Sequence, residues 1–175
     1  MAESSPARRH RVEGPKSVTV AVVTVSDTRT PETDENGRVI RESLVKKGHK
    51  VVRHAICLDE PTKINKELNA SLATGCDVII FNGGTGIAPR DVTVETVGLR
   101  LEKRIDGFGE LFRHLSYKKI GSAAMLSRAV AGTCQSTIVF CLPGSPNATK
   151  LAVDYLILPE LSHIVGLVKG KTTHY

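Results

Sequence analysis

The sequence predicts an α/β fold in which helices cover both faces of a largely parallel sheet. Continuous runs of β-branched and aliphatic residues, typical of strands buried on both faces, alternate with segments of helical periodicity. Hydrophobic residues make up 41% of the chain but aromatic residues only 4%, with no Trp, so the core must be built from Val, Ile, Leu and Ala. At 175 residues, the chain has the size of a single domain.

The first half of the chain alternates strands with helices. Each strand is a continuous apolar run, and each helix places Ile or Leu three or four residues apart before a glycine that ends it. The predicted elements are a strand over residues 18 to 25, a helix ending at Gly48, a strand over 50 to 57, a helix from Pro61 to Gly75, and a strand over 77 to 81.

The second half begins with two helical patterns and ends with two more. Between them lies the last clear strand, the apolar run TIVFCL. The predicted elements are helices over about 94 to 103 and 109 to 115, the strand over 137 to 142, a helix over 148 to 156, and a helix that starts near Pro159. Such alternation is typical of a mostly parallel sheet with helices on both sides.

The N-terminal segment differs in composition from the rest of the chain. Residues 1 to 17 contain four basic and two acidic side chains and are rich in Pro and Ser, without the apolar stretch of a signal peptide. We therefore expect a disordered basic tail over residues 1–17 and a single domain over residues 18–175.

The net charge of +6 favours anionic partners. Phosphorylated small molecules and nucleic acid both satisfy this charge, but the scarcity of aromatic rings argues against a platform that stacks single-stranded bases.

The longest uncharged stretch, residues 129 to 149, is interrupted by Gly, Pro and polar residues, which argues against a membrane span. Four cysteines without a C-x-x-C pair are expected to be free, buried thiols, so we expect a soluble cytoplasmic protein. The four are Cys57, Cys76, Cys134 and Cys141.

The richest candidate site is the segment NGGTGIAPRDVT, residues 82 to 93. Ligands of open parallel sheets bind beyond the carboxyl ends of the strands, and this segment follows a predicted strand directly. Its glycines allow close approach of the backbone to an anion, and a hydroxyl, a guanidinium and a carboxylate stand beside them. Phosphate binding is the favoured interpretation, and a tight turn in which Asp91 caps the next helix is the alternative. The candidate residues are Gly83, Gly84, Thr85, Gly86, Arg90 and Asp91.

Other strand ends carry further candidates. Asp59 and Asp91 both follow strands, so one crevice could hold both carboxylates, as a Mg²⁺ ion that bridges phosphates requires. An N-cap role for Asp59 is equally compatible with the pattern. Asp27 is either a cap or a ligand contact, and the pair Ser127 and Arg128 either clamps an anion or is solvated.

Five segments make the chain similar to the MoaB/MogA family of molybdenum cofactor biosynthesis, more closely to its MoaB branch. The similarity extends over residues 18 to 168. It implies a three-layer α/β/α sandwich and a nucleotidyltransferase activity: the terminal phosphate of molybdopterin attacks the α-phosphate of Mg·ATP, giving molybdopterin-AMP and pyrophosphate. The segments are VTVSDT, FNGGTGIAPRDVT, GFGELFR, LSRAVAG and LPGSPNA.

The resemblance also implies roles for individual residues. Asp59 and Asp91 match the functional aspartates and would be catalytic or hold Mg²⁺, while the glycine loop matches the loop that holds the phosphates. On physical grounds, Arg90 would offset the negative charge of those phosphates. The remaining matched positions line the pterin pocket or its neighbouring loop, and they are Ser26, Asp27, Glu110, Ser127, Pro143, Gly144 and Ser145.

Relatives in this family form trimers or hexamers, and the apolar stretch 151 to 168 agrees with self-association, so a homotrimer or homohexamer is expected. Molybdopterin and ATP are the expected partners, with neither nucleic acid nor a membrane among them. Within the family, MoaB-type proteins do not always perform the adenylylation. A non-catalytic molybdopterin-binding or carrier protein is therefore the alternative function.

Overall fold

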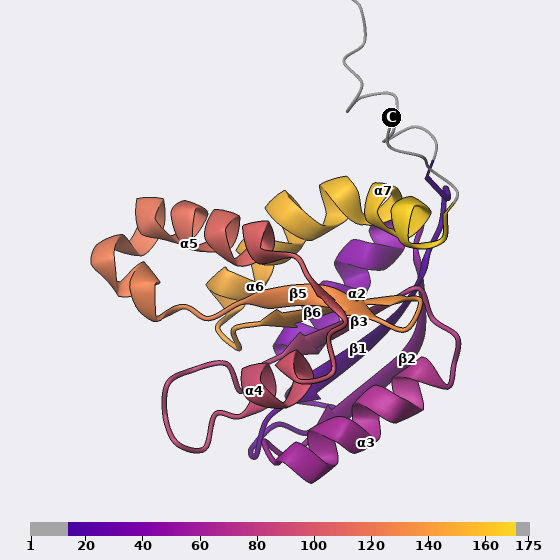
Figure 1. Cartoon of the computed structure of the whole chain (residues 1–175). Helices are drawn as coiled ribbons and strands as arrows, with labels where there is room; N and C mark the ends of the chain where they lie inside the picture. Colours follow the sequence, from indigo (N-terminus) through magenta and orange to yellow (C-terminus); the bar gives the residue numbers. More distant parts are fainter. Residues whose placement is uncertain (1–13, 171–175) are drawn as a thin grey trace, which may run out of the picture.

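The computed structural model describes residues 14 to 170 and shows one six-stranded sheet with the strand order β2-β1-β3-β6-β5-β4. Helices cover both faces of the sheet (Figure 1). The helices α2, α5, α6 and α7 pack on one face, and α3 and α4 pack on the other, each face having its own hydrophobic cluster. The expected α/β/α sandwich with a mostly parallel sheet is confirmed.

The four predicted strands form the parallel part of the sheet. They pair in the spatial order β2, β1, β3, β6, so their carboxyl ends share one edge. The Val, Ile and Phe side chains of β1, β3 and β6 are buried, as expected for strands covered on both faces, whereas the residues of the edge strand β2 are partly buried or exposed. Their bounds are Thr19–Val25 for β1, Lys50–Cys57 for β2, Val78–Asn82 for β3 and Thr137–Leu142 for β6.

Two short strands beyond β6 were not predicted. β5, Val130–Cys134, runs antiparallel to β6, and β4, Lys103–Arg104, pairs antiparallel with β5. The predicted helix over 94 to 103 is therefore shorter: α4 covers Thr93–Gly98, and the chain then turns into β4. At Gly132 in β5, a Cβ atom would lie 2.4 Å from the carbonyl oxygen of Lys103, so this glycine permits the close approach of β4.

The two helices of the first half form as predicted. α2, Glu35–Lys46, begins at Asp34, whose carboxylate accepts a hydrogen bond from the amide of Gly37 at 2.9 Å. α3, Pro61–Leu72, starts with proline in its first turn. Gly48 and Gly75 follow the two helices with φ angles of +84° and +68°. The helix stops predicted at these glycines are thereby confirmed.

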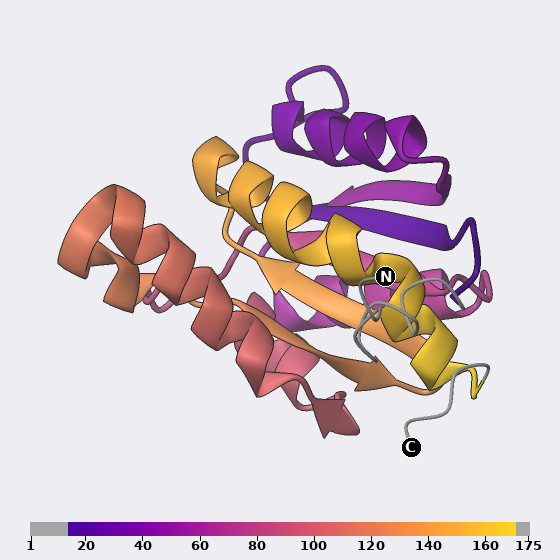
Figure 2. The same ribbon diagram turned by 90° about the horizontal axis from the view of Figure 1, so that it is seen from above.

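Helix α5 is longer than predicted. It covers Asp106–Ile120 and continues into a 3₁₀ turn, η1, over Gly121–Leu126. Together α5 and η1 form an arm that reaches past the end of the sheet (Figure 2). The arm then returns the chain to β5, so the segment before β5 arrives at the edge where the parallel strands end.

The last two predicted helices form one continuous helix. α6, Pro146–Ala152, passes through a π-helical segment, η2, Val153–Ile157, into α7, Leu158–Val168. The π segment precedes Pro159, where a regular α-helix would lose a hydrogen bond. With a mean hydropathy of 1.6, the helix is long and apolar enough to cross a membrane. Ile157, Leu161 and Val165 are buried in the core, so one face of this helix packs against the sheet.

The ends of the described chain are anchored at the amino edge of the sheet. Gly14 lies against the backbone of Ser162 in α7, and the Ser17 hydroxyl donates to the carbonyl of Gly48 at 2.7 Å. Residues 1 to 13 of the predicted tail lie outside the described residues. At the other end, the Lys169 ammonium contacts the carboxylate of Asp77.

The cysteines are free thiols, as predicted. Cys76, Cys134 and Cys141 are buried, and Cys57 is partly buried. Burial raises the pKa of the Cys57 thiol to about 12, with smaller contributions from Glu67 and Asp59. These thiols therefore stay protonated at neutral pH, which makes them poor nucleophiles.

Candidate functional site

The exits of the parallel strands are tied together at the carboxyl edge of the sheet. The amide of Ser26, after β1, donates to the carbonyl of Cys57 at the end of β2, at 2.9 Å. The amide of Gly83, after β3, donates to the carbonyl of Leu142 at the end of β6, also at 2.9 Å. Four predicted candidate segments therefore converge on one edge, as the rule for open parallel sheets requires.

The two candidate aspartates are brought into one crevice. The carboxylate of Asp59 accepts a hydrogen bond at 3.2 Å from the amide of Val92, the residue that follows Asp91. Burial raises the pKa of Asp59, the hydrogen bond from Val92 opposes this rise, and the negative charge of Asp91 adds to it. The predicted meeting of these two carboxylates is thus seen in the structure.

The glycine loop has a backbone that only glycine allows. Gly83 and Gly84 have φ angles of +111° and +62°, the left-handed region that favours glycine. A Cβ atom on Gly83 would lie 2.1 Å from the carbonyl oxygen of Val25. On Gly84 it would lie 2.3 Å from the hydroxyl of Thr93 and 2.4 Å from the carboxylate of Asp59. Both glycines therefore serve close packing between strand exits.

The amides of this loop are open to a ligand. Within residues 14 to 170, the amides of Gly84, Thr85 and Gly86 donate to no acceptor. Successive free amides next to left-handed glycines form a concave surface of positive partial charge that suits an anion. The loop geometry therefore agrees with the predicted phosphate site.

Asp91 closes a turn within the loop instead of capping α4. Its amide donates to the carbonyl of Ala88 at 2.9 Å, and its Oδ2 atom accepts from the amide of Ala88 at 3.1 Å. The N-cap of α4 is Val92, which makes no side-chain cap. The tight turn of the alternative interpretation is present, but the predicted helix cap is not, and Oδ1 of Asp91 remains available.

Two neighbouring cavities lie beside these loops. A cavity of about 380 Å³ is lined by the glycine loop, Asp91 and Arg128, and one of about 110 Å³ by the C-terminal half of α5, Ser145 and the start of α6. Ser127 and Pro143 line both cavities. Ligands in the two cavities would therefore meet at these two residues.

Six predicted site residues lie outside the cavity walls, and they are Ser26, Asp27, Asp59, Gly83, Arg90 and Glu110. Asp27 and Arg90 form an ion pair with each other across the strand exits, and Asp27 also accepts from the amide of Asp59 at 3.1 Å. Glu110 is an exposed residue of α5 that lines neither cavity. Asp27 therefore connects the segment after β1 to Asp59 and Arg90, a structural role that the sequence pattern did not specify.

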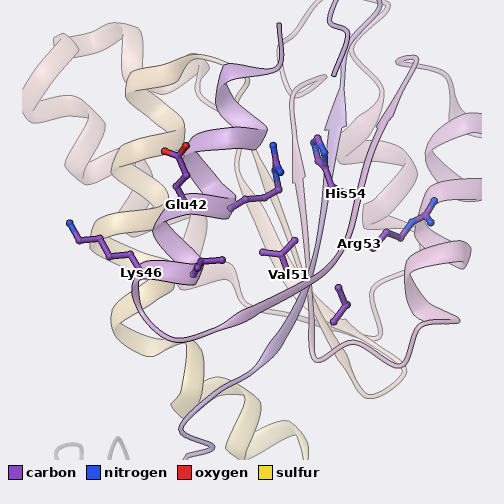
Figure 3. A pocket seen from close by; sticks show the side chains of 8 residues that line it. Glu42, Lys46, Val51, Arg53 and His54 are labelled. Atoms are coloured by element: carbon purple, nitrogen blue, oxygen red, sulfur yellow. The ribbon is translucent and has the colours of Figure 1, made fainter. Parts of the chain in front are cut away.

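A larger cavity of about 600 Å³ lies between α2 and the edge strand β2 (Figure 3). Glu42 and Lys46 of α2 face it, with Val51 and His54 of β2. None of the predicted site residues lines it, and it has no glycine loop, so we place the candidate site at the two smaller cavities.

A polar cluster behind this larger cavity was missed by the sequence analysis. Buried Asp34 accepts hydrogen bonds from the hydroxyl of Thr24 and pairs with Nε2 of His54, both at 2.8 Å. Asp34 stands three residues before Gly37, which is the spacing between an N-cap residue and the amide that it accepts from. This spacing is the one feature of the sequence that could have indicated the role of Asp34. The cluster fixes the start of α2 to β1 and β2.

A family model described as a probable molybdopterin binding domain matches residues 21–163. The chain belongs to this family. Molybdenum cofactor biosynthesis protein B of Bacillus cereus is 50% identical over 157 residues, which are 89% of this chain and 93% of that protein. The resemblance to the MoaB/MogA family, and to its MoaB branch, is thereby confirmed.

Solved structures of the MoaB branch share the fold. A crystal structure of molybdenum cofactor biosynthesis protein B has a TM-score of 0.86 and 49% identity, covering 89% of this chain and 98% of that one. The tungsten cofactor synthesizing protein MoaB from Pyrococcus furiosus has a TM-score of 0.81 and 36% identity, covering 89% and 99%. This MoaB-like chain thus spans nearly the full length of these proteins.

Proposed function

We propose that this protein acts in molybdenum cofactor biosynthesis as a cytoplasmic molybdopterin adenylyltransferase. The observation that carries the proposal is the crevice in which Asp59 and Asp91 lie beside the free amides of the glycine loop. The names of the MoaB relatives support the pathway. The chemistry of the crevice supports the reaction, because joining two phosphorylated molecules requires close control of negative charge.

The loop residues would act as the phosphate holder. The amides of Gly84, Thr85 and Gly86 have no acceptor within residues 14 to 170 and would donate to phosphate oxygens. The shared walls at Ser127 and Pro143 would place a pterin phosphate in one cavity next to a nucleotide phosphate in the other. The oxygen of the pterin phosphate then bonds to the α-phosphorus of ATP, and the bond to pyrophosphate breaks.

The residues of the crevice fit a Mg²⁺ ion. Asp59 and Asp91 offer carboxylate oxygens, and the buried hydroxyl of Thr93 lies next to the carboxylate of Asp59. Hard oxygen donors, completed by phosphate oxygens, are what Mg²⁺ prefers, and a full cage of protein ligands is not needed. When bound, the ion would offset the charge of the phosphates.

Pyrophosphate release tests the proposal directly. Purified protein incubated with molybdopterin, ATP and Mg²⁺ is expected to release pyrophosphate, whereas Asp59→Asn and Asp91→Asn should abolish release and keep the fold by circular dichroism. Asp106→Asn is a matched control, because this carboxylate is exposed at the start of α5 and lines neither cavity. Pterin binding without pyrophosphate release would instead support a non-catalytic carrier, and full activity of both variants would contradict the assignment.

Self-association belongs to the same proposal. We expect a homotrimer or homohexamer, with molybdopterin and ATP as the ligands and no role for nucleic acid. Light scattering at working concentration checks this, and a monomer would contradict it. A duplex that binds more tightly than phosphate ligands would show that the positive charge serves nucleic acid.

A further inference from the structure

Arg128 reaches the glycine loop from a distant part of the chain. It follows η1 and precedes β5, and because β5 runs antiparallel to β6, this position lies where the parallel strands end. Its side chain is 29% exposed and forms part of the wall of the 380 Å³ cavity. Partial burial of a guanidinium is favourable where its N–H groups have acceptors.

The partners of Arg128 are the loop itself and the helix after it. Nε donates to the carbonyl oxygen of Thr85 at 2.9 Å, and one terminal nitrogen donates to that of Gly86 at 2.6 Å. That nitrogen also donates to the carboxylate of Glu95 in α4 at 3.2 Å, and the other terminal nitrogen contacts the same carboxylate. One guanidinium therefore joins the two ends of the segment that contains Asp91.

These bonds set the direction of the loop amides. Within a planar trans peptide, the carbonyl and the following N–H point in opposite directions. Fixing the carbonyls of Thr85 and Gly86 therefore fixes the N–H groups of Gly86 and Ile87. Because most donors of Arg128 are already used and Glu95 offsets its charge, the guanidinium is committed to the protein.

We propose that Arg128 is a positioning residue for adenylyl transfer, which holds the glycine loop in its phosphate-binding shape through the carbonyls of Thr85 and Gly86, with Glu95 orienting the guanidinium. This inference rests on the proposed function. It predicts that Arg128 acts through the loop and that Glu95 works with it. Lysine cannot replace it, since a single ammonium does not reproduce the planar fork.

Steady-state kinetics of three single variants and one double variant test this role. Arg128→Ala and Arg128→Lys should each lower kcat by about 10- to 100-fold, the range expected when reacting groups lose their alignment. Glu95→Gln should lower kcat in the same direction, and the double variant Arg128→Ala with Glu95→Gln should be no worse than Arg128→Ala alone. Added guanidinium ions should restore part of the kcat of Arg128→Ala. The exposed pair Arg38 and Glu42 in α2 provides matched controls, Arg38→Lys and Glu42→Gln.

Opposite results would overturn the proposal. If Arg128 bound phosphate directly, Glu95→Gln would leave the positive charge of Arg128 free for the phosphate, and kcat would be unchanged or higher. Arg128→Ala would then mainly raise the KM for ATP. Thermal unfolding of each variant identifies a loss of kcat that is caused by misfolding. Arg128→Lys keeps the test valid if Arg128→Ala does not fold.

Backbone NMR relaxation separates this inference from the proposed function. In the absence of any ligand, the order parameters of the Gly86 and Ile87 amides should fall from about 0.85, the value of a rigid backbone, to below about 0.6 in Arg128→Lys. Unchanged order parameters would overturn the role of Arg128 whether or not the wild type releases pyrophosphate. A wild type without pyrophosphate release, but with lower order parameters in the variant, would overturn the activity and leave the loop-holding role standing.

Discussion

The backbone amide of Val92 donates to the carboxylate of Asp59, 33 residues earlier in the chain, at 3.2 Å. This bond joins the exit of β2 to the segment after β3, and it places Asp59 beside Asp91. Two carboxylates held together in a partly buried crevice repel each other when both are ionised. The crevice therefore favours the binding of a cation. The same pair of negative charges that would serve the function lowers the stability of the folded protein.

The first prediction concerns the effect of the Asp59 charge on the stability of the protein. Asp59→Asn removes a charge that burial and Asp91 disfavour, while an amide oxygen can still accept from Val92. We expect the unfolding free energy at pH 7 to stay equal or rise by up to about 1 kcal/mol, as at other strained functional positions. Urea unfolding with and without Mg²⁺ measures this. Asp59→Ala, which loses the acceptor, should be less stable than Asp59→Asn, and the reverse order would contradict the account.

The second prediction concerns the glycine loop. In Gly84→Ala the new Cβ would meet Thr93 and Asp59 in addition to the strain of a φ angle of +62°. We expect a loss of at least about 2 kcal/mol in unfolding free energy, together with a marked loss of pyrophosphate release.

Gly75→Ala is the matched control for Gly84→Ala. Its φ angle is +68°, but a Cβ there would meet nothing within 4 Å, so only the backbone strain of about 1 kcal/mol remains. Its activity should match the wild type. Equal destabilisation in the two variants would show that contacts at the crevice do not contribute.

The third prediction concerns Asp77 at the amino edge of the sheet. Its carboxylate accepts from the amide and hydroxyl of Thr19 at 2.7 and 2.9 Å and contacts Lys169. Burial alone would raise its pKa, but the hydrogen bonds from Lys169 and Thr19 lower it below the usual value. Asp77→Asn should cost about 1–3 kcal/mol of unfolding free energy at pH 7, because Lys169 loses its partner.

The pH dependence of this cost follows from the sign of the shift. A lowered pKa in the folded state means that Asp77 stabilises the protein above its unfolded pKa, about 3.9, and that this contribution is lost as the pH falls through the folded value. The difference between wild type and Asp77→Asn should therefore shrink as the pH is lowered from 7 to below about 4. A difference that grows on acidification would contradict the ion pair.

The parallel part of the fold could be predicted because its strands are continuous aliphatic runs and its helices have clear stops. The glycine loop and the two aspartates could be placed because they follow such strands directly. The two antiparallel strands could not be predicted: β5 is short and contains Gly132, and β4 is the charged pair Lys103–Arg104, which resembles the end of a helix in the sequence. Their pairing depends on tertiary contacts with β6, which local patterns do not record.

The part played by Arg128 was hidden for the same reason. Its neighbours in sequence favoured an anion clamp only slightly over a solvated side chain, because its partners are 33 to 43 residues away. The cluster of Asp34, Thr24 and His54 likewise joins two strands and a helix start. Such long-range polar contacts depend on how the elements pack and not on local residue patterns.

The continuous helix from Pro146 to Val168 connects the two edges of the sheet. It begins at Ser145, in the wall of the smaller cavity, and the chain after it reaches Lys169 and Asp77 at the opposite edge, where Gly14 also packs. Both ends of the described chain therefore leave the molecule on the side away from the cavities. A fluorophore or surface linker attached through residue 170, where a Cβ atom would meet nothing within 4 Å, would leave the crevice open, so that ligand binding can be followed on immobilised protein.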